Sequence, residues 1–253
     1  MKVAFVLATA ALAVVAAVPA ADTAGRVYEL RTYTAAPGKL DALNARFRDH
    51  TCKLFEKHGM TNVGYWTPVE NADNQLIYIL AHASREAADR SWKAFGADPE
   101  WKKVQSESEA NGKLLTKPPE RRYLAATDYS PAVRAPAGEH VYELRTYTAA
   151  DGRLGGLNTR FRDHTMKLFE RHGMTNVGYW TLTKGQPVAD NTLVYLLAHK
   201  DMDAAKKSWA AFRADPDWTA ARKASEGKAG GPLTVQGGVK SVYLKPTDYS
   251  PMK

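Results

Sequence analysis

Apolar and polar residues alternate from Val27 to Tyr33, in a stretch rich in β-branched and aromatic residues, and this period of two predicts a β-strand. Pro37-Gly38 ends the strand. From Lys39 to His58 the apolar residues recur at helical spacing, which predicts an amphipathic helix closed by Gly59, with a stripe of Leu40, Leu43, Phe47 and Leu54. The pattern further predicts strands at about 60–67, 75–82 and 122–126, a helix from Ser84, and a helical stretch begun by Asp98-Pro99.

The whole pattern then occurs a second time. VYELRTYT stands at 27–34 and 141–148, HGMTNVGYWT at 58–67 and 172–181, and TDYSP at 127–131 and 247–251. The offset grows from 114 to 117 residues before the LAH at 80–82 and 197–199, so the second copy has three additional residues there. A unit of this length is a small domain rather than a solenoid repeat. The chain is therefore predicted to be two like domains, a homodimer fused into one polypeptide.

The element order in each copy is β-α-β-β-α-β, which is the ferredoxin-like motif with all helices on one face of the sheet. The bare face of each sheet needs a cover, and the sister copy is the obvious one. We therefore expect an α+β protein in which two antiparallel sheets pack face to face as an intrachain, barrel-like pseudo-dimer, which can assemble further. The predicted boundaries are 26–129 for domain 1, 130–139 for a Pro- and Ala-rich linker, and 140–251 for domain 2.

The start of the chain has the pattern of a signal peptide. Lys2, the apolar run from Val3 to Val18 and a V-x-A site predict cleavage after Ala20, and the run is short for a membrane span. We expect an exported protein, periplasmic or secreted, with no membrane association after cleavage. The net charge of +8 is spread among acidic residues without an arginine run, which argues against nucleic-acid binding.

The first strand of each copy carries charged residues on one face. The residues that share this face are Glu29, Arg31, Tyr33, Glu143, Arg145 and Tyr147. A ferredoxin-like order makes the strand central, so the charges meet either the helices or the sister sheet, and we favour the sister sheet. They are interpreted as a structural ion-pair network. In the alternative interpretation, Arg31 and Arg145 bind an anionic ligand group.

The first helix of each copy carries a histidine in its apolar stripe. A helical wheel places His50 there with Arg46 at the edge, and His164 and Arg160 repeat the arrangement. A histidine against apolar surface needs a hydrogen-bond partner. His50 is therefore either a core residue bonded to a strand or a general base in a pocket between helix and sheet. His58, just before Gly59, is explained by helix capping.

The sequence predicts no metal and no cofactor. His50 and His58 are eight residues apart, too far to share an ion on one helix, and no Cys-x-x-Cys, phosphate-binding glycine loop or G-x-S-x-G is present. Haem held by a single axial histidine leaves no spacing signature, so that alternative stays open. Trp66 and Trp180, at strand ends, are interpreted as core residues or as the walls of a pocket.

Both copies resemble the NIPSNAP family, whose domains belong to the dimeric α/β-barrel superfamily. The resemblance rests on YELRTY at 28–33 and 142–147, on HGM followed by VGYW, and on ADPEW at 97–101 and ADPDW at 214–218. It implies a fold and no particular reaction; superfamily members include cofactor-free monooxygenases, isomerases and haem-degrading enzymes with pockets between sheet and helices. The second copy departs from the pattern at Asp151-Gly152 and Gly155-Gly156, so we expect any degraded pocket there.

Two functions follow as hypotheses. The first is the binding or transformation of a small, partly aromatic or apolar molecule in one pocket per repeat, with His50 and His164 as polar or catalytic centres. Any catalysis would be cofactor-independent and monooxygenase- or isomerase-like. The second is a non-catalytic scaffold or protein-interaction domain. A cavity of roughly 300 Å³ or more beside His50 would favour the first.

Overall fold

The computed structural model describes residues 25–253, so the predicted signal peptide lies outside the described residues. The first repeat contains β1 (Val27–Thr34), α1 (Leu40–Arg46), the π turn η2 (Phe47–Thr51), α2 (Cys52–Lys57), β2 (Thr61–Pro68), β3 (Gln75–His82), α3 (Arg85–Ala97), α4 (Pro99–Ser108) and β4 (Glu120–Ala126). The second contains β5 (Val141–Ala149), α5 (Leu154–Arg160), the π turn η3 (Phe161–Thr165), α6 (Met166–Arg171), β6 (Thr175–Leu182), η4 (Ala189–Asn191), β7 (Thr192–His199), α7 (Met202–Ala214), α8 (Pro216–Lys228) and β8 (Thr234–Pro246).

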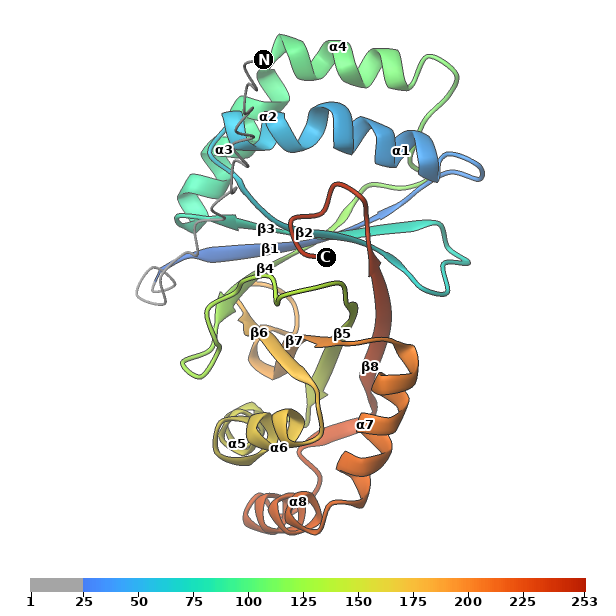
Figure 1. Cartoon of the computed structure of the whole chain (residues 1–253). Coiled ribbons are helices and arrows are strands. Elements are labelled where there is room, and N and C mark those ends of the chain that lie inside the picture. Colours follow the sequence, from blue (N-terminus) through green and yellow to red (C-terminus); the bar gives the residue numbers. More distant parts are fainter. Residues whose placement is uncertain (1–24) are drawn as a thin grey trace, which may run out of the picture.

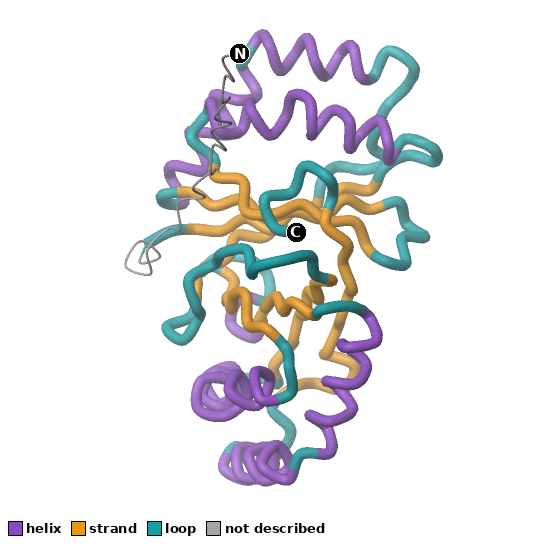
Figure 2. The backbone as a smooth tube through the Cα atoms, in the orientation of Figure 1, coloured by secondary structure: helices purple, strands orange, loops and turns teal. Residues whose placement is uncertain are grey.

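The strands form one closed barrel in the order β1-β3-β2-β8-β5-β7-β6-β4. Within each repeat β1 or β5 is central, as the ferredoxin-like order requires. The two repeats are joined edge to edge by antiparallel pairing of β2 with β8 and of β4 with β6. Helices cover the outer faces at opposite ends of the molecule, with the strands between them (Figures 1 and 2). The prediction of two ferredoxin-like sheets that cover each other is confirmed.

The barrel interior is a filled apolar core. Trp66 and Trp180 are fully buried there and pack against Tyr142 and Tyr28 of the other repeat, with ring centroids 5.4 and 5.5 Å apart. A Cβ at Gly64 would overlap the Trp66 ring, so this position needs glycine. The core interpretation of the two tryptophans therefore fits the structure, and the pocket-wall interpretation does not.

Each repeat ends in a TDYS turn that lies on the other repeat. Ser130 Oγ accepts the N–H of Tyr179 at 3.0 Å, and Tyr129 donates its hydroxyl proton to Asn158 Oδ1 at 2.8 Å. Residues 247–250 make the equivalent bonds to the first repeat, from Tyr249 to Asn44 and from Tyr65 to Ser250. In Figure 1 the C-terminal segment accordingly rises from β8 beside the first repeat. The closing motif thus binds the repeats together.

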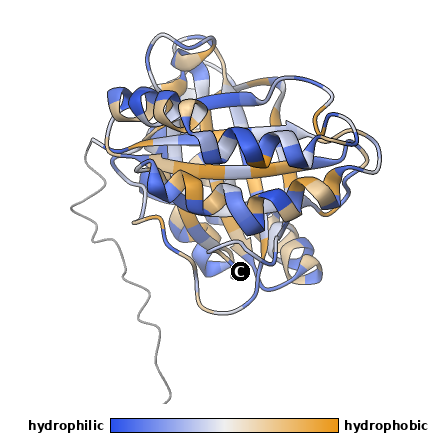
Figure 3. Cartoon of the chain, turned by 90° about the horizontal axis from the view of Figure 1, so that it is seen from above, coloured by the Kyte–Doolittle hydropathy of each residue, from blue (hydrophilic) through white to orange (hydrophobic). Residues whose placement is uncertain are grey.

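The helical layer of the first repeat is amphipathic. Hydrophilic and hydrophobic residues alternate around its helices, while the strand seen between them is hydrophobic over most of its length (Figure 3). The inward side of these helices packs on Tyr65, Tyr78 and Leu80 of the sheet. Among residues 25–253, no helix combines the length and apolarity needed to cross a bilayer.

Candidate functional site

The charged residues of β1 face the helices and not the sister sheet. Glu29 is fully buried, and its carboxylate accepts hydrogen bonds from His82 at 2.9 Å, Trp92 at 2.6 Å and Arg31 at 2.7 Å. The Arg31 guanidinium lies 4.1 Å from the centroid of the Trp92 ring on α3. Our expectation of the sister sheet is therefore wrong. The apolar face of the strand packs in the barrel interior. The charged face lies on the helix side of the sheet, because polar partners for it are found only there.

The second repeat builds the same network around Glu143. Its carboxylate accepts bonds from His199 at 2.9 Å, Trp209 at 2.7 Å, Ser241 at 2.5 Å and Arg145 at 2.5 Å. Burial alone would raise the pKa of Glu143, but these hydrogen bonds and the Arg145 charge outweigh it and lower the pKa to about 2. A buried carboxylate held by four donors fits the structural ion-pair interpretation.

The tyrosines on the same strand faces belong to the core beneath the helices. Tyr33 packs edge-on against Phe47, and Tyr147 packs edge-on against Phe161, with ring centroids 5.6 and 5.7 Å apart. Tyr147 also accepts a 3.2 Å hydrogen bond from Arg145. These side chains fill space between sheet and helices, so the sheet-side pocket that we expected is occupied by aromatic rings.

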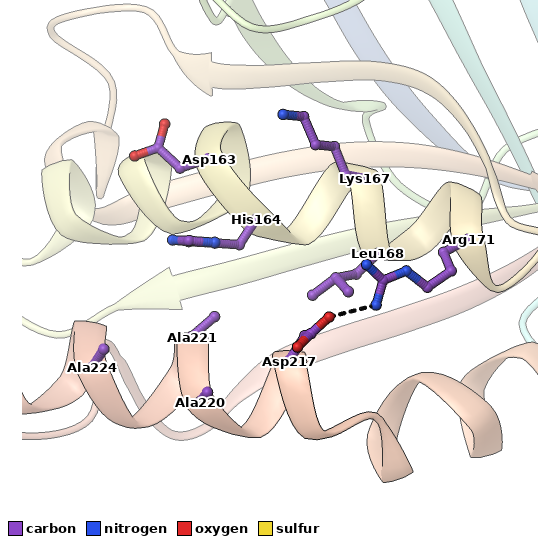
Figure 4. A pocket seen from close by; sticks show the side chains of 9 residues that line it. All are labelled: Asp163, His164, Lys167, Leu168, Arg171, Asp217, Ala220, Ala221 and Ala224. Carbon is purple, nitrogen blue, oxygen red and sulfur yellow. Dashed lines mark hydrogen bonds and ion pairs between the residues drawn. The ribbon is translucent and has the colours of Figure 1, made fainter.

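His50 and His164 do not face the sheet. Both are exposed, and each lies in a π turn. A π turn closes an i→i+5 hydrogen bond and holds more residues than an α-helical turn. Each of its residues therefore rotates about the helix axis by less than the 100° that a helical wheel assumes. The core and sheet-pocket interpretations of both histidines are therefore wrong. The π turn directs His164 toward α8 instead, as Figure 4 shows.

His58 and His172 connect the end of the first long helix to the start of the last helix. His58 Nε2 lies 2.7 Å from Asp98, which caps α4, and His172 lies 2.7 Å from Asp215, which caps α8. Hydrogen bonds from Lys57 and His58 hold the pKa of Asp98 well below its usual range. These pairs are structural contacts at helix ends: His58 stands at the end of α2, as the capping interpretation expects, and its ring bonds to the start of another helix, which that interpretation did not include.

Arg160, at the end of α5, is a buried cation without adequate partners. Its exposed fraction is 5%, and its Nε and Nη1 have no hydrogen-bond partner among the described residues. Glu226 Oε1 lies 3.6 Å from Nη1, beyond hydrogen-bond length, and the guanidinium lies 5.1 Å from the Trp218 ring centroid. Burial lowers the pKa of Arg160, because the charge of Glu226 offsets only part of the desolvation.

Arg46, at the same position in the first repeat, is better satisfied. It is equally buried and donates hydrogen bonds of 3.3 Å to Ser108 and 3.4 Å to Glu109. The Glu109 side chain is 14% exposed, whereas that of Glu226 is 32% exposed. The two repeats therefore differ in the charge balance at this arginine.

Arg160 lines a groove between the long helix α5–η3–α6 and α8. Two adjoining cavities of about 490 and 430 Å³ share His164, Ala221 and Ala224. The larger also contains Arg160, Gly156 and Lys228, and the smaller contains Leu168 and Ala220. In Figure 4 His164 and Leu168 point toward α8, Asp163 and Lys167 point away, and the 2.7 Å ion pair of Arg171 with Asp217 spans the groove at one end.

The groove depends on small residues that the first repeat lacks. Where the second repeat has Ala220 and Ala224, the first has Lys103 and Glu107, which form a 3.9 Å ion pair. Gly155-Gly156 replaces Asp41-Ala42, and a Cβ at Gly155 would meet nothing within 4 Å. We expected these glycines to degrade a pocket. Gly156 lines the open groove instead, and Gly155 lies on an open helix surface beside it, so no pocket is lost there.

No metal site is visible in the part of the chain that the structure describes, where no three His, Cys, Asp or Glu side chains come together. The half-buried thiol of Cys52 has its pKa raised by burial to about 11, so it is protonated near neutral pH and is a poor nucleophile or metal ligand. The groups available to a ligand in the groove thus include the guanidinium groups of Arg160 and Arg153, the Lys228 ammonium, the His164 imidazole and an apolar wall.

The sequence patterns did not identify the residues of α8 as part of a site. Ala220, Ala221 and Ala224 carry no chemistry, and nothing in their spacing indicates a ligand. The available signal was the difference between copies, because Lys103 and Glu107 become alanines while the flanking helix gains two glycines.

Fold and site together define a dimeric α/β barrel formed within one chain. A protein from Lactobacillus acidophilus, provisionally named a monooxygenase, has a similar structure with a TM-score of 0.55 and 10% identity, covering 88% of this chain and 94% of its own. A provisionally named monooxygenase from Fusobacterium nucleatum has a TM-score of 0.54 and 11% identity, covering 88% and 92%. At such identities the likeness shows the fold alone.

The profile of the NIPSNAP family matches residues 28–131 and 142–251, so the chain belongs to the NIPSNAP family and carries its domain twice. A NIPSNAP-family protein of unknown function from Agrobacterium tumefaciens is 21% identical, with a TM-score of 0.38, and covers 48% of this chain and 100% of its own. No curated protein matches the chain in sequence.

Proposed function

We propose that the protein binds a small anionic molecule in the groove between α5–η3–α6 and α8, with Arg160 as the group that receives the anion. The observation that carries this proposal is Arg160, a 95% buried arginine in the wall of an open groove, whose buried Nε and Nη1 have no hydrogen-bond partner among the described residues. A buried charge without partners destabilises the fold. Guanidinium groups form strong charge-assisted hydrogen bonds with carboxylate and phosphate, so an anion in the groove that reaches the accessible edge of this guanidinium would balance its charge and reduce this cost.

The remainder of the groove supports a ligand with an apolar part. Leu168, Ala221 and Ala224 line its wall. His164 lies between the two cavities, one helical turn beyond Arg160, and is the candidate general base if the ligand is transformed. A cofactor-independent, monooxygenase- or isomerase-like reaction is the narrower form of the proposal. His164→Gln tests it, because a catalytic imidazole predicts lost turnover with retained binding.

Titration calorimetry with benzoate, hexanoate and phenyl phosphate, and with 1-hexanol as an uncharged control, tests binding. We expect the anions to bind and the alcohol to bind at least about tenfold more weakly, because a hydrogen bond to a charged group contributes about 1.5–3 kcal/mol. Arg160→Gln should remove the preference for anions. Arg46→Gln, the matched change in the first repeat, should leave it intact. Anion binding that is equal in both variants, or absent, would reject the proposal and favour a scaffold protein.

We also propose that the mature protein works outside the cytoplasm. The proposal is supported by the apolar run from Val3 to Val18 and the cleavage pattern before Ala21. Fractionation of cells that express the full chain, with N-terminal sequencing of the product, tests it. A product that begins at Ala21 in the exported fraction is expected, and an uncleaved cytoplasmic chain would contradict it.

A further inference from the structure

We infer, on the basis of the proposed function, that the ligand is an elongated amphipathic monocarboxylate. Its head would lie on Arg160, and its unbranched apolar body would extend between α6 and α8 toward the Arg171–Asp217 ion pair. The inference has three supports, which are the positive charge at the head, the chemistry of the wall, and the ion pair at the far end of the groove.

The charge at the head favours an anionic group. Arg145, which is largely buried in this repeat, is paired with Glu143 at 2.5 Å. Arg160 has only Glu226 at 3.6 Å, and the same cavity is also lined by Arg153 and Lys228, so positive charge exceeds negative charge there. A carboxylate supplies two acceptors for a guanidinium and brings less negative charge beside Glu226 than a phosphate dianion does.

The wall of the groove favours an apolar chain. Between Arg160 and the far end, the smaller cavity is lined on its inner side by Leu168, Ala220, Ala221 and Ala224. Asp163 and Lys167 also border it, but their side chains point away from α8 (Figure 4). The alanine methyl groups leave a shallow channel in which methylene groups can replace water. From Arg160 to Arg171 the helix rises by roughly 16 Å, at about 1.5 Å per residue, which is longer than a single aromatic ring.

The far end of the groove argues against a second anionic group. Arg171 donates hydrogen bonds to Asp217 at 2.7 Å and to Asp215 at 3.3 Å, so its charge is already balanced. A dicarboxylate would have to break these contacts or leave its second carboxylate on an alanine surface. The paired arginine at this end therefore favours a monocarboxylate with a terminal methyl group over a dicarboxylate of the same length.

Calorimetry with straight-chain carboxylates from butyrate to decanoate, matched 1-alkanols and matched dicarboxylates tests the inference on the mature chain. Affinity should rise by up to about fourfold per methylene, the value for a fully buried methylene group, and then level off when the groove is filled. Arg160→Gln should weaken the long carboxylates by about tenfold or more and bring them to the level of the alkanols. Arg46→Gln is the matched control.

A second variant tests the body of the ligand without touching the buried arginine. Ala220→Leu, which changes the smaller cavity only, should weaken decanoate by about tenfold or more, the loss expected for two or more methylenes, and should leave butyrate unchanged. Lys103→Leu, which places a leucine at the equivalent position of the first repeat, should have no effect on either. Thermal unfolding of each variant checks that it folds.

The outcomes separate the two proposals. Arg160-dependent binding without dependence on chain length, or with equal or stronger binding of dicarboxylates or phenyl phosphate, overturns the monocarboxylate inference and leaves the binding proposal standing. No Arg160-dependent binding of any anion overturns both. If Arg160→Gln does not fold, Arg160→Lys replaces it, and unchanged affinity together with an inert Ala220→Leu would reject the inference.

Discussion

Replacing Glu143 by glutamine removes the charge at the centre of the buried network of the second repeat while it keeps the size of the side chain. The carboxylate accepts hydrogen bonds from four side chains and pairs with Arg145, whose side chain is 12% exposed. The amide of glutamine turns an N–H group toward some of these donors. Arg145 is left as a buried cation without its anion, a change that costs about 3–5 kcal/mol.

The pKa of Glu143 gives a second estimate of the same contribution. Its lowering from 4.5 to about 2 corresponds to about 3 kcal/mol, at 1.36 kcal/mol per unit. A carboxyl group whose pKa is lower in the folded state stabilises the fold fully above its unfolded pKa, and the contribution is lost as the pH falls through the folded pKa. The stabilisation from Glu143 should therefore be complete above about pH 5 and should disappear between about pH 5 and pH 2.

Urea unfolding, followed by tryptophan fluorescence and circular dichroism, measures both effects. At pH 7 we expect Glu143→Gln to lower the free energy of unfolding by about 3 kcal/mol, and near pH 3 we expect a clearly smaller difference. Glu29→Gln should behave in the same direction, since the pKa of Glu29 is also lowered despite burial, by its bond to His82 and by Arg31. A difference that is small at pH 7, or that does not change with pH, would refute the reasoning.

Two smaller effects follow from the packing between and within the repeats. A Cβ at Gly178 would overlap the Trp180 ring, so Gly178→Ala should lower the free energy of unfolding by about 1–3 kcal/mol. Gly155→Ala lies on an open helix surface and should raise the free energy of unfolding by up to about 1 kcal/mol. Urea unfolding measures both effects, and effects of the same sign would contradict this reasoning. Ser130→Ala removes the hydroxyl that accepts the Tyr179 N–H of the other repeat and should lower the free energy of unfolding by about 1–3 kcal/mol. The loss should be visible as a lower melting temperature. An unchanged melting temperature would show that the turn does not hold the repeats together.

The fold could be predicted from local patterns, and the site could not. Strands and helices were found because their periods are properties of short segments, and the duplication showed what covers each sheet. The period of two identified the face that carries Glu29 but not its direction, since both faces of a central strand are covered. The predicted orientation of the His50 side chain was wrong because one π turn changes the phase of the helix. The partners of Arg160 come from α8, about 60 residues later in the chain, and helix-to-helix contacts of that kind have no local pattern.

The two halves of this chain share one scaffold, and this makes the stoichiometry of binding a strict test of where the ligand lies. The buried Glu-Arg networks occur in both repeats, so a ligand held by Arg31 and Arg145 would bind twice per chain. The groove at Arg160 depends on small residues, Ala220 and Ala224 among them, that only the second repeat has. Calorimetry should therefore give one site per chain. Two equal sites would place the ligand at the shared networks and would reject the groove as the binding site. One site that is lost in Arg160→Gln and kept in Arg46→Gln would mean that function has diverged between two halves that keep the same fold.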